Sequence, residues 1–207
     1  INLTATHIED IIDKRVVIKN REAEPIIKKV FDELIKFYPK ISLDYQKFRK
    51  TFPLHPITVR YLSGLTQIFS QNRGVIHFVL SEIKNILEAP YDSLITPDKI
   101  YDHFEERIRE IPDYSSLARV VFDYYKNNIL KILLKEKLAS IGLSIIKILI
   151  LTEISPFEKK KEAKEIAEIL LKKISFITDE VNYEYIKDAI LEPLVNHKMY
   201  INKENNI

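Results

Sequence analysis

The sequence lacks cysteine and tryptophan, and it has only three glycines and one methionine among its 207 residues. Without cysteine the chain cannot form disulfides, attack a substrate with a thiolate or bind zinc through sulfur. Gly64, Gly74 and Gly142 are isolated, and none of them precedes a lysine. A phosphate-binding loop needs clustered glycines followed by lysine and serine or threonine. The chain therefore has no Walker-type nucleotide site of its own.

Other catalytic and metal-binding patterns are missing as well. The five histidines show no HExxH or comparable ligand spacing, and no serine lies in a GxSxG elbow. His103 and Glu106 lie one turn apart on a predicted helix, but such pairs are common by chance. We therefore expect no metal site and no enzymatic activity in this chain alone.

Charge gives no sign of a nucleic-acid partner, and hydropathy gives no sign of a membrane span. The chain has 32 lysines and arginines against 30 acidic residues, and a net charge of +2 does not by itself indicate a nucleic-acid partner. The longest apolar run, residues 141–154, is interrupted by Lys147 and Glu153 and is shorter than the ~20 residues of a membrane span. We expect a buried core helix there, no membrane partner and a cytoplasmic location.

The start of the sequence suggests a piece of a longer chain. The sequence begins at Ile1, and its only methionine is Met199. A natural reading frame does not begin this way. We therefore expect a fragment whose functional partner is another part of the same polypeptide.

What the sequence does contain is helical periodicity. After Pro25, apolar residues recur at 27, 30, 31, 34, 35 and 38, which is one continuous stripe on a helix. Thr96, Pro97 and Asp98 give the cap, first residue and acidic first turn of another helix. Similar patterns predict a mainly α fold with helices near residues 6–17, 25–38, 56–69, 70–87, 97–108, 117–134, 141–152, 163–171 and 183–195.

These elements predict two domains. Residues 1–130 form a helical bundle. Residues 131–207 contain three predicted helices followed by the alternating sequence HKMYINKENN, which we interpret as a strand leading into a short β hairpin. That order is typical of a small winged-helix-like domain.

The clearest candidate site is Arg73, within SQNRGVIHF, where Ser70 is expected to cap a helix. A positive charge in the first turn opposes the helix dipole by about 0.3–1 kcal/mol unless an anion is present. Together with the free N–H groups of that turn, Arg73 predicts an anion site to which Gln71 and Asn72 add polar contacts. The alternative is a surface arginine paired with a nearby carboxylate.

Two longer stretches extend this interpretation. FPLHPITVRYLSGLTQIFSQNRGVIHFVLSEI, followed by LITPDKIYDHF, resembles the region after the P-loop core in large prokaryotic P-loop ATPases. These ATPases are of the phage-defence-associated type, related to the BREX and phage-growth-limitation ATPases and distantly to AAA+ initiators. HIEDIIDKRVVIK is similar to their connector between core and lid. The resemblance covers about residues 5–105.

The resemblance implies a function for the candidate site. In AAA+ relatives the helical lid presents an arginine, the second sensor, to the γ-phosphate of ATP held by the P-loop core. Arg73 matches that position, and His55 with Pro56 would look onto the nucleotide side of the lid or brace it. The implied cofactor-binding residues are thus Arg73, Asn72, Gln71 and His55. The ATP and Mg²⁺ would be held by an upstream P-loop core of the parent ATPase, with DNA or another defence-system subunit as a further partner.

Two alternatives stay open. A nucleic-acid-binding winged helix would use a set of lysines, namely Lys159, Lys160, Lys161, Lys164, Lys172, Lys173, Lys198 and Lys203. Against it, the predicted recognition helix carries three acidic residues, Glu184, Asp188 and Glu192, and one lysine, Lys187, so its face would repel phosphate. The second alternative is a protein-interaction scaffold. The 11 tyrosines and 10 phenylalanines mostly fall on predicted buried stripes, which favours core packing over base stacking.

Overall fold

The computed structural model describes residues 9–16, 19, 21–37, 44–65, 68, 72–90, 93–156, 161–170 and 179–203; within these ranges the side chains of 15–16, 36–37, 72–73 and 179–182 are not described. The described residues are mainly helical, as predicted. They contain no strand, and their one β-type pairing is an isolated parallel bridge between Leu54 and Ile95.

The chain divides into two compact units. Unit 1 comprises residues 1–103 and 155–157, and unit 2 comprises residues 104–154 and 158–207. The chain first passes from one unit to the other within helix α6 (Asp98–Glu110). The predicted division at residue 130 falls inside α8 (Asp123–Leu133), whose hairpin partner α9 (Glu136–Ile154) also belongs to unit 2.

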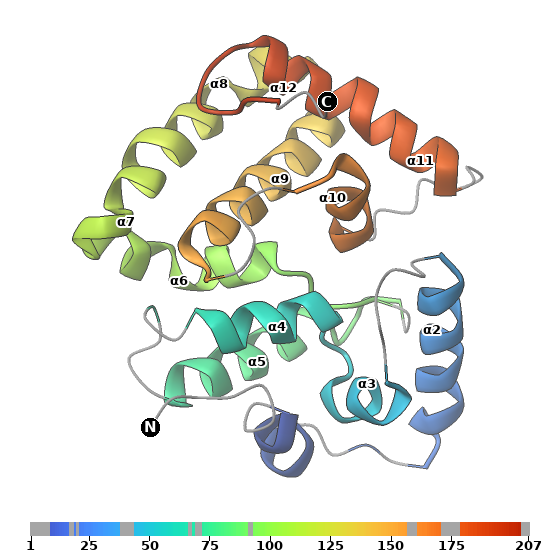
Figure 1. Ribbon diagram of the computed structural model, residues 1–207. Coiled ribbons are helices and arrows are strands. Elements are labelled where there is room, and N and C mark those ends of the chain that lie inside the picture. The colour runs from blue at the N-terminus through green and yellow to red at the C-terminus, as the bar shows by residue number, and fades with distance from the viewer. Residues whose placement is uncertain are drawn as a thin grey trace. The chain divides into compact units, whose positions relative to one another are not determined.

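Unit 1 consists of short helices that the sequence largely predicted (Figure 1). They are the π-helical segment η1 (Ile12–Val16), α2 (Ala23–Phe37), α3 (Tyr45–Thr51), α4 (Pro56–Gly64), α5 (Asn72–Ile86) and the first half of α6. Only α3 was not predicted. Its signal was present in Asp44, the N-cap residue, whose carboxylate accepts hydrogen bonds from the backbone N–H groups of Gln46 and Lys47.

Most of the predicted α2 stripe is buried, but Ile35 is 39% exposed and position 38 lies outside the described residues. Ile27, Val30, Phe31 and Leu34 are all buried. The ring of Phe31 meets the ring of Tyr45 edge-on, at 5.1 Å between ring centroids. The apolar face of α2 thus packs on α3, the helix that follows it in the chain.

A short extended segment before α4 is joined to the loop before α6. The Ile95 N–H donates to the Pro53 carbonyl at 2.9 Å, and the His55 N–H donates to the Ile95 carbonyl at 3.0 Å. The Thr58 hydroxyl also donates to the Ile95 carbonyl, at 2.7 Å. These bonds satisfy buried backbone groups, and they fix the start of α4 against the chain that leads into α6.

Unit 2 contains the rest of α6, α7 (Pro112–Ser116), η2 (Leu117–Phe122), α8, α9, α10 (Ala163–Leu170), α11 (Asp179–Ile186), η3 (Lys187–Leu191) and α12 (Glu192–Asn196). Residues 112–116 lie between two of the predicted helices, and in the structure they form α7, which the sequence pattern did not predict. Pro112 occupies the first position of α7, where its missing N–H leaves no helical hydrogen bond unmade.

The apolar run predicted to be a core helix is the central part of α9. Most of its side chains are buried, and α9 packs against α8, α10, η2 and η3. Gly142 lets α8 approach closely, because a Cβ atom there would lie 2.6 Å from Leu133 Cδ1 and 3.2 Å from Ile129 Cδ1. Among the described residues, no helix is long and apolar enough to cross a membrane.

The predicted strand at the C-terminal end is absent from the described residues 197–203, and the rest of the expected hairpin lies outside them. Lys198 and Tyr200 have φ values of 55° and 57°, in the left-handed region, which is incompatible with an extended strand. The Tyr125 hydroxyl donates to the Met199 carbonyl and so holds this turn against α8. Side-chain contacts have therefore overridden the alternating pattern.

One arginine joins two helices of unit 2. Arg109, in the last turn of α6, contacts Glu105 Oε1 at 2.6 Å and Asp123 Oδ1 at 2.5 Å. Its side chain is only 16% exposed. Hydrogen bonds from Arg109 lower the pKa of the Asp123 carboxyl, and the bonds to Asp123 and Glu105 raise the pKa of Arg109. The charges therefore stabilise one another and tie α6 to the start of α8.

We predict that Arg109→Ala lowers the free energy of unfolding by about 1–3 kcal/mol, because it leaves two partly buried carboxylates without their cation. The measurement is urea unfolding followed by circular dichroism. Arg107→Ala is the matched control on the same helix, since Arg107 pairs with Glu110 in solvent at 3.2 Å; it should change stability by no more than about 0.5 kcal/mol. Equal effects of the two substitutions would contradict the proposed tie.

Candidate functional site

The predicted anion site lies at the start of α5. Asn72 and Arg73 are the first two residues of this helix, so the predicted helix start is confirmed to within two residues. The first turn of α5 contains no acidic residue. Gln71 and Ser70 lie outside the described residues, and the side chains of Asn72 and Arg73 are not described. The contact of Arg73 with an anion stays a prediction.

His55 lies at the N-cap of α4 and is completely buried. Its Nδ1 atom accepts a hydrogen bond from the Ile57 N–H at 3.2 Å. A neutral imidazole with an accepting Nδ1 carries its proton on Nε2, and Nε2 has no partner among the described residues. His55 therefore stabilises the start of α4 as a cap.

Burial also determines the charge of His55. Removal from water disfavours the imidazolium and lowers the pKa of His55 from 6.5 to about 3. No neighbouring charge contributes to this shift. The side chain is therefore neutral at physiological pH and cannot supply a cation to a phosphate while it stays buried.

The candidate nucleic-acid lysines are only partly described. Lys159, Lys160, Lys172 and Lys173 lie outside the described residues. Lys164 is exposed on α10, Lys161 is partly exposed before it, and Lys198 is exposed after α12. Lys203 contacts Glu192 at 2.6 Å, and this hydrogen bond raises the pKa of Lys203. The carboxylate thus compensates the charge of one of the candidate nucleic-acid lysines.

A histidine pair in unit 1 was not predicted. His77 of α5 and His103 of α6 lie with Nδ1 of the first 3.1 Å from Nε2 of the second. The ring of Phe78 packs edge-on against His103, at 5.5 Å between centroids. The two histidines are 26 residues apart on different helices, so no spacing rule reveals the contact. No group of three or more possible metal ligands occurs in the described part of the chain.

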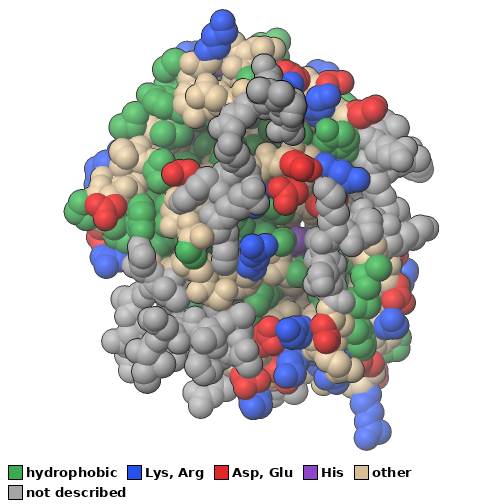
Figure 2. Space-filling view, viewed as in Figure 1, with side chains coloured by type: hydrophobic (Ala, Val, Ile, Leu, Met, Phe, Trp, Pro, Cys, Tyr) green, Lys and Arg blue, Asp and Glu red, His purple; other side chains and the backbone are tan. Residues whose placement is uncertain are grey.

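Large apolar side chains are exposed on η2, on α8 and at the C-cap residue of α8, all in unit 2. Leu134 is 81% exposed and Leu130 is 53% exposed, and Val120 is also exposed. Figure 2 shows hydrophobic side chains over the part of the molecule where α8 lies. We call these three residues the apolar α8 face.

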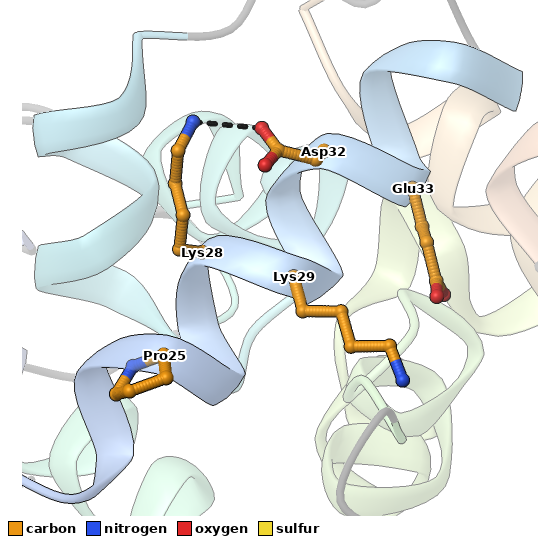
Figure 3. Close-up of a pocket in the computed structure, with 5 residues that line it drawn as sticks. All are labelled: Pro25, Lys28, Lys29, Asp32 and Glu33. Carbon is orange, nitrogen blue, oxygen red and sulfur yellow. Dashed lines mark hydrogen bonds and ion pairs between the residues drawn. The ribbon is translucent and has the colours of Figure 1, made fainter.

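A shallow hollow lies along α2 and is lined by Pro25, Lys28, Lys29, Asp32 and Glu33 (Figure 3). Lys28 contacts Asp32 at 2.7 Å, whereas Lys29 and Glu33 extend to the other side. One helix supplies every lining residue, and two positive charges lie beside two negative ones. The hollow therefore offers no convergent set of groups for catalysis or for binding a charged ligand.

The buried histidine predicts a loss of stability in mild acid. The unfolded chain protonates His55 near pH 6.5, whereas the folded chain does so near pH 3. Because the unfolded state binds more protons, stability falls as the pH drops below 6.5. From this group alone the free energy of unfolding should fall by about 2 kcal/mol between pH 7.5 and pH 5. Urea unfolding at the two pH values measures this difference.

The matched variant for this prediction is His55→Asn. Asparagine is a good N-cap whose side-chain oxygen can accept the Ile57 N–H, and it does not titrate. The variant should lose less stability than the wild type over the same pH interval, even if it is less stable at pH 7.5. An unchanged pH dependence in the variant would mean that His55 is not the responsible group.

Comparisons with known proteins place the chain in a family. Neither a curated protein nor a solved structure matches it. A family model described as the DUF6079 second domain matches residues 19–197. The match includes most of both compact units. It begins at residue 19, before α2, and ends at residue 197, after α12. The chain therefore belongs to the DUF6079 second-domain family.

Proposed function

We propose that this chain is the lid and interaction module of a P-loop ATPase. In this proposal Arg73 contacts the phosphates of ATP–Mg²⁺ held by a P-loop core elsewhere in the same polypeptide. The module itself carries out no chemistry. It couples the nucleotide state of the core to a partner, which is DNA or another subunit of a defence system.

The observation that carries the proposal is the start of α5. A 15-residue helix begins at Asn72 with an arginine in its first turn and no acidic residue there to balance it. The unpaired N–H groups and the helix dipole make such a start positive, so an arginine is unfavourable there without an anion. A nucleotide phosphate would supply the anion, and arginine binds phosphate through two hydrogen bonds.

The surroundings of α4 support the role of a lid. The hydrogen bonds between the 53–55 segment and Ile95, together with the His55 cap, hold the start of α4 in place. The matching family model describes a second domain, which agrees with a chain that works beside another domain.

The apolar α8 face supports the interaction part of the proposal. Leu130 and Leu134 are one helical turn apart and both are exposed, and neighbouring exposed apolar side chains favour a protein contact. A winged-helix fold for residues 131–207 and nucleic-acid binding have weaker support. The helices of that region follow the expected order, but Glu184 and Asp188 are exposed on the predicted recognition helix, and Glu192 already pairs with Lys203.

The test is Arg73→Ala in the full-length protein that contains this domain and its P-loop core. Loss of a preorganised cation at the γ-phosphate should lower ATP turnover about tenfold or more. Steady-state ATPase assays and nucleotide binding measure the effect. Arg60→Ala, at an exposed position within α4, is the control and should leave turnover unchanged. Unchanged turnover and unchanged nucleotide affinity in the Arg73 variant would refute the proposal.

A further inference from the structure

The contact between His77 and His103 has a chemistry that the proposed function does not use. At 3.1 Å, the two ring nitrogens form a hydrogen bond in which one imidazole donates and the other accepts. The ring centroids are 5.1 Å apart, so the rings approach each other nearly end to end. Two neutral imidazoles satisfy this bond, and so do one imidazole and one imidazolium.

Double protonation removes the bond altogether. An imidazolium has two donors and no acceptor, so two imidazolium rings cannot hydrogen-bond to each other. Two positive charges at this separation also repel one another. Burial, and secondly the charge of His77, lower the pKa of His103 below 6.5. The second protonation therefore opposes the folded contact, and the cost appears as the pH falls below 6.5.

Charged groups accompany the pair on α6, on α5 and in η1, and most of those described are paired with one another. On α6, Lys99 lies 3.7 Å from Asp102 and 4.0 Å from Asp98. Glu106 and Arg107 follow one turn after His103, and Arg107 pairs with Glu110. On α5, the charged residue one turn before His77 is Arg73, and Glu82 lies more than one turn after it; burial raises the pKa of Glu82. In η1, which packs on α5, Asp13 pairs with Lys19 and Lys14 pairs with Asp10.

The histidine pair lies close to the point where the chain passes from unit 1 to unit 2. His103 lies at the end of the unit 1 portion of α6, and the same helix continues into unit 2. We propose that the His77–His103 contact is a proton-sensitive link: it anchors α6 to α5 while either imidazole is neutral, and it releases α6 when both are protonated. This link would regulate the helix that joins the two units, and it does not depend on nucleotide binding.

The test is hydrogen exchange of the 207-residue chain at pH 7.5 and pH 5, followed by mass spectrometry, with EDTA present to remove metal ions. After correction for intrinsic rates, amides of residues 98–103 should exchange about two- to tenfold faster at pH 5, which corresponds to the loss of one hydrogen bond. Amides of α2 report any global loss of stability and serve as the internal reference.

The matched variant combines His77→Asn with His103→Gln. The asparagine amide replaces Nδ1 and the glutamine amide replaces Nε2, so a hydrogen bond is kept but cannot titrate. The variant should show no extra exchange in residues 98–103 at pH 5. The same acceleration in variant and wild type, or none in the wild type, would overturn the proposal.

Ring ¹⁵N chemical shifts give a second measurement that does not depend on the stability of the double variant. In His77→Asn the pKa of His103 should rise relative to the wild type, because the charge of the neighbouring imidazolium is removed. An unchanged His103 titration in that variant would also overturn the proposal.

Discussion

The backbone contact between residues 53–55 and Ile95 is the constraint on which the arrangement of unit 1 depends. Both Ile95 backbone groups are used, and the Thr58 hydroxyl shares the Ile95 carbonyl. Buried amides left without partners cost several kcal/mol, so this pairing is held strongly once the surrounding apolar side chains exclude water. It connects the start of α4 to the chain between α5 and α6. The starts of α4 and α6 are therefore determined together.

His55 caps α4 beside the same backbone contact, and its burial makes the stability of this region depend on pH. As a cap, its ring replaces water at the first turn of α4, and as a buried group it has to stay neutral. An asparagine or serine would cap the helix without a titratable group. The chain has instead a side chain that fills more of the core and links the stability of unit 1 to pH.

Unit 2 is stabilised by a different balance of interactions. Its centre is α9, whose buried isoleucines and leucines meet α8 so closely that only glycine fits at position 142 without displacing a neighbouring side chain. Arg109 forms an ion pair with Asp123 at the start of α8, and Tyr125, in the first turn of the same helix, holds the C-terminal turn. Apolar burial supplies the general stability, whereas these two polar contacts select one position for α6 and for the tail.

The sequence by itself determined the helices, because helix formation depends on signals within a few residues. The stripe after Pro25, the proline at the start of α4 and the Thr96–Asp98 start of α6 all appear where the pattern indicated. It also determined that Arg73 opens a helix, which is the local half of the candidate site. Tertiary structure decided the rest. The division within α6, the His77–His103 pair, the partners of Arg109 and the irregular tail all join residues that are distant in sequence or depend on packing between helices. No local periodicity encodes these contacts, because they follow from which helix faces meet and which buried polar groups must find partners.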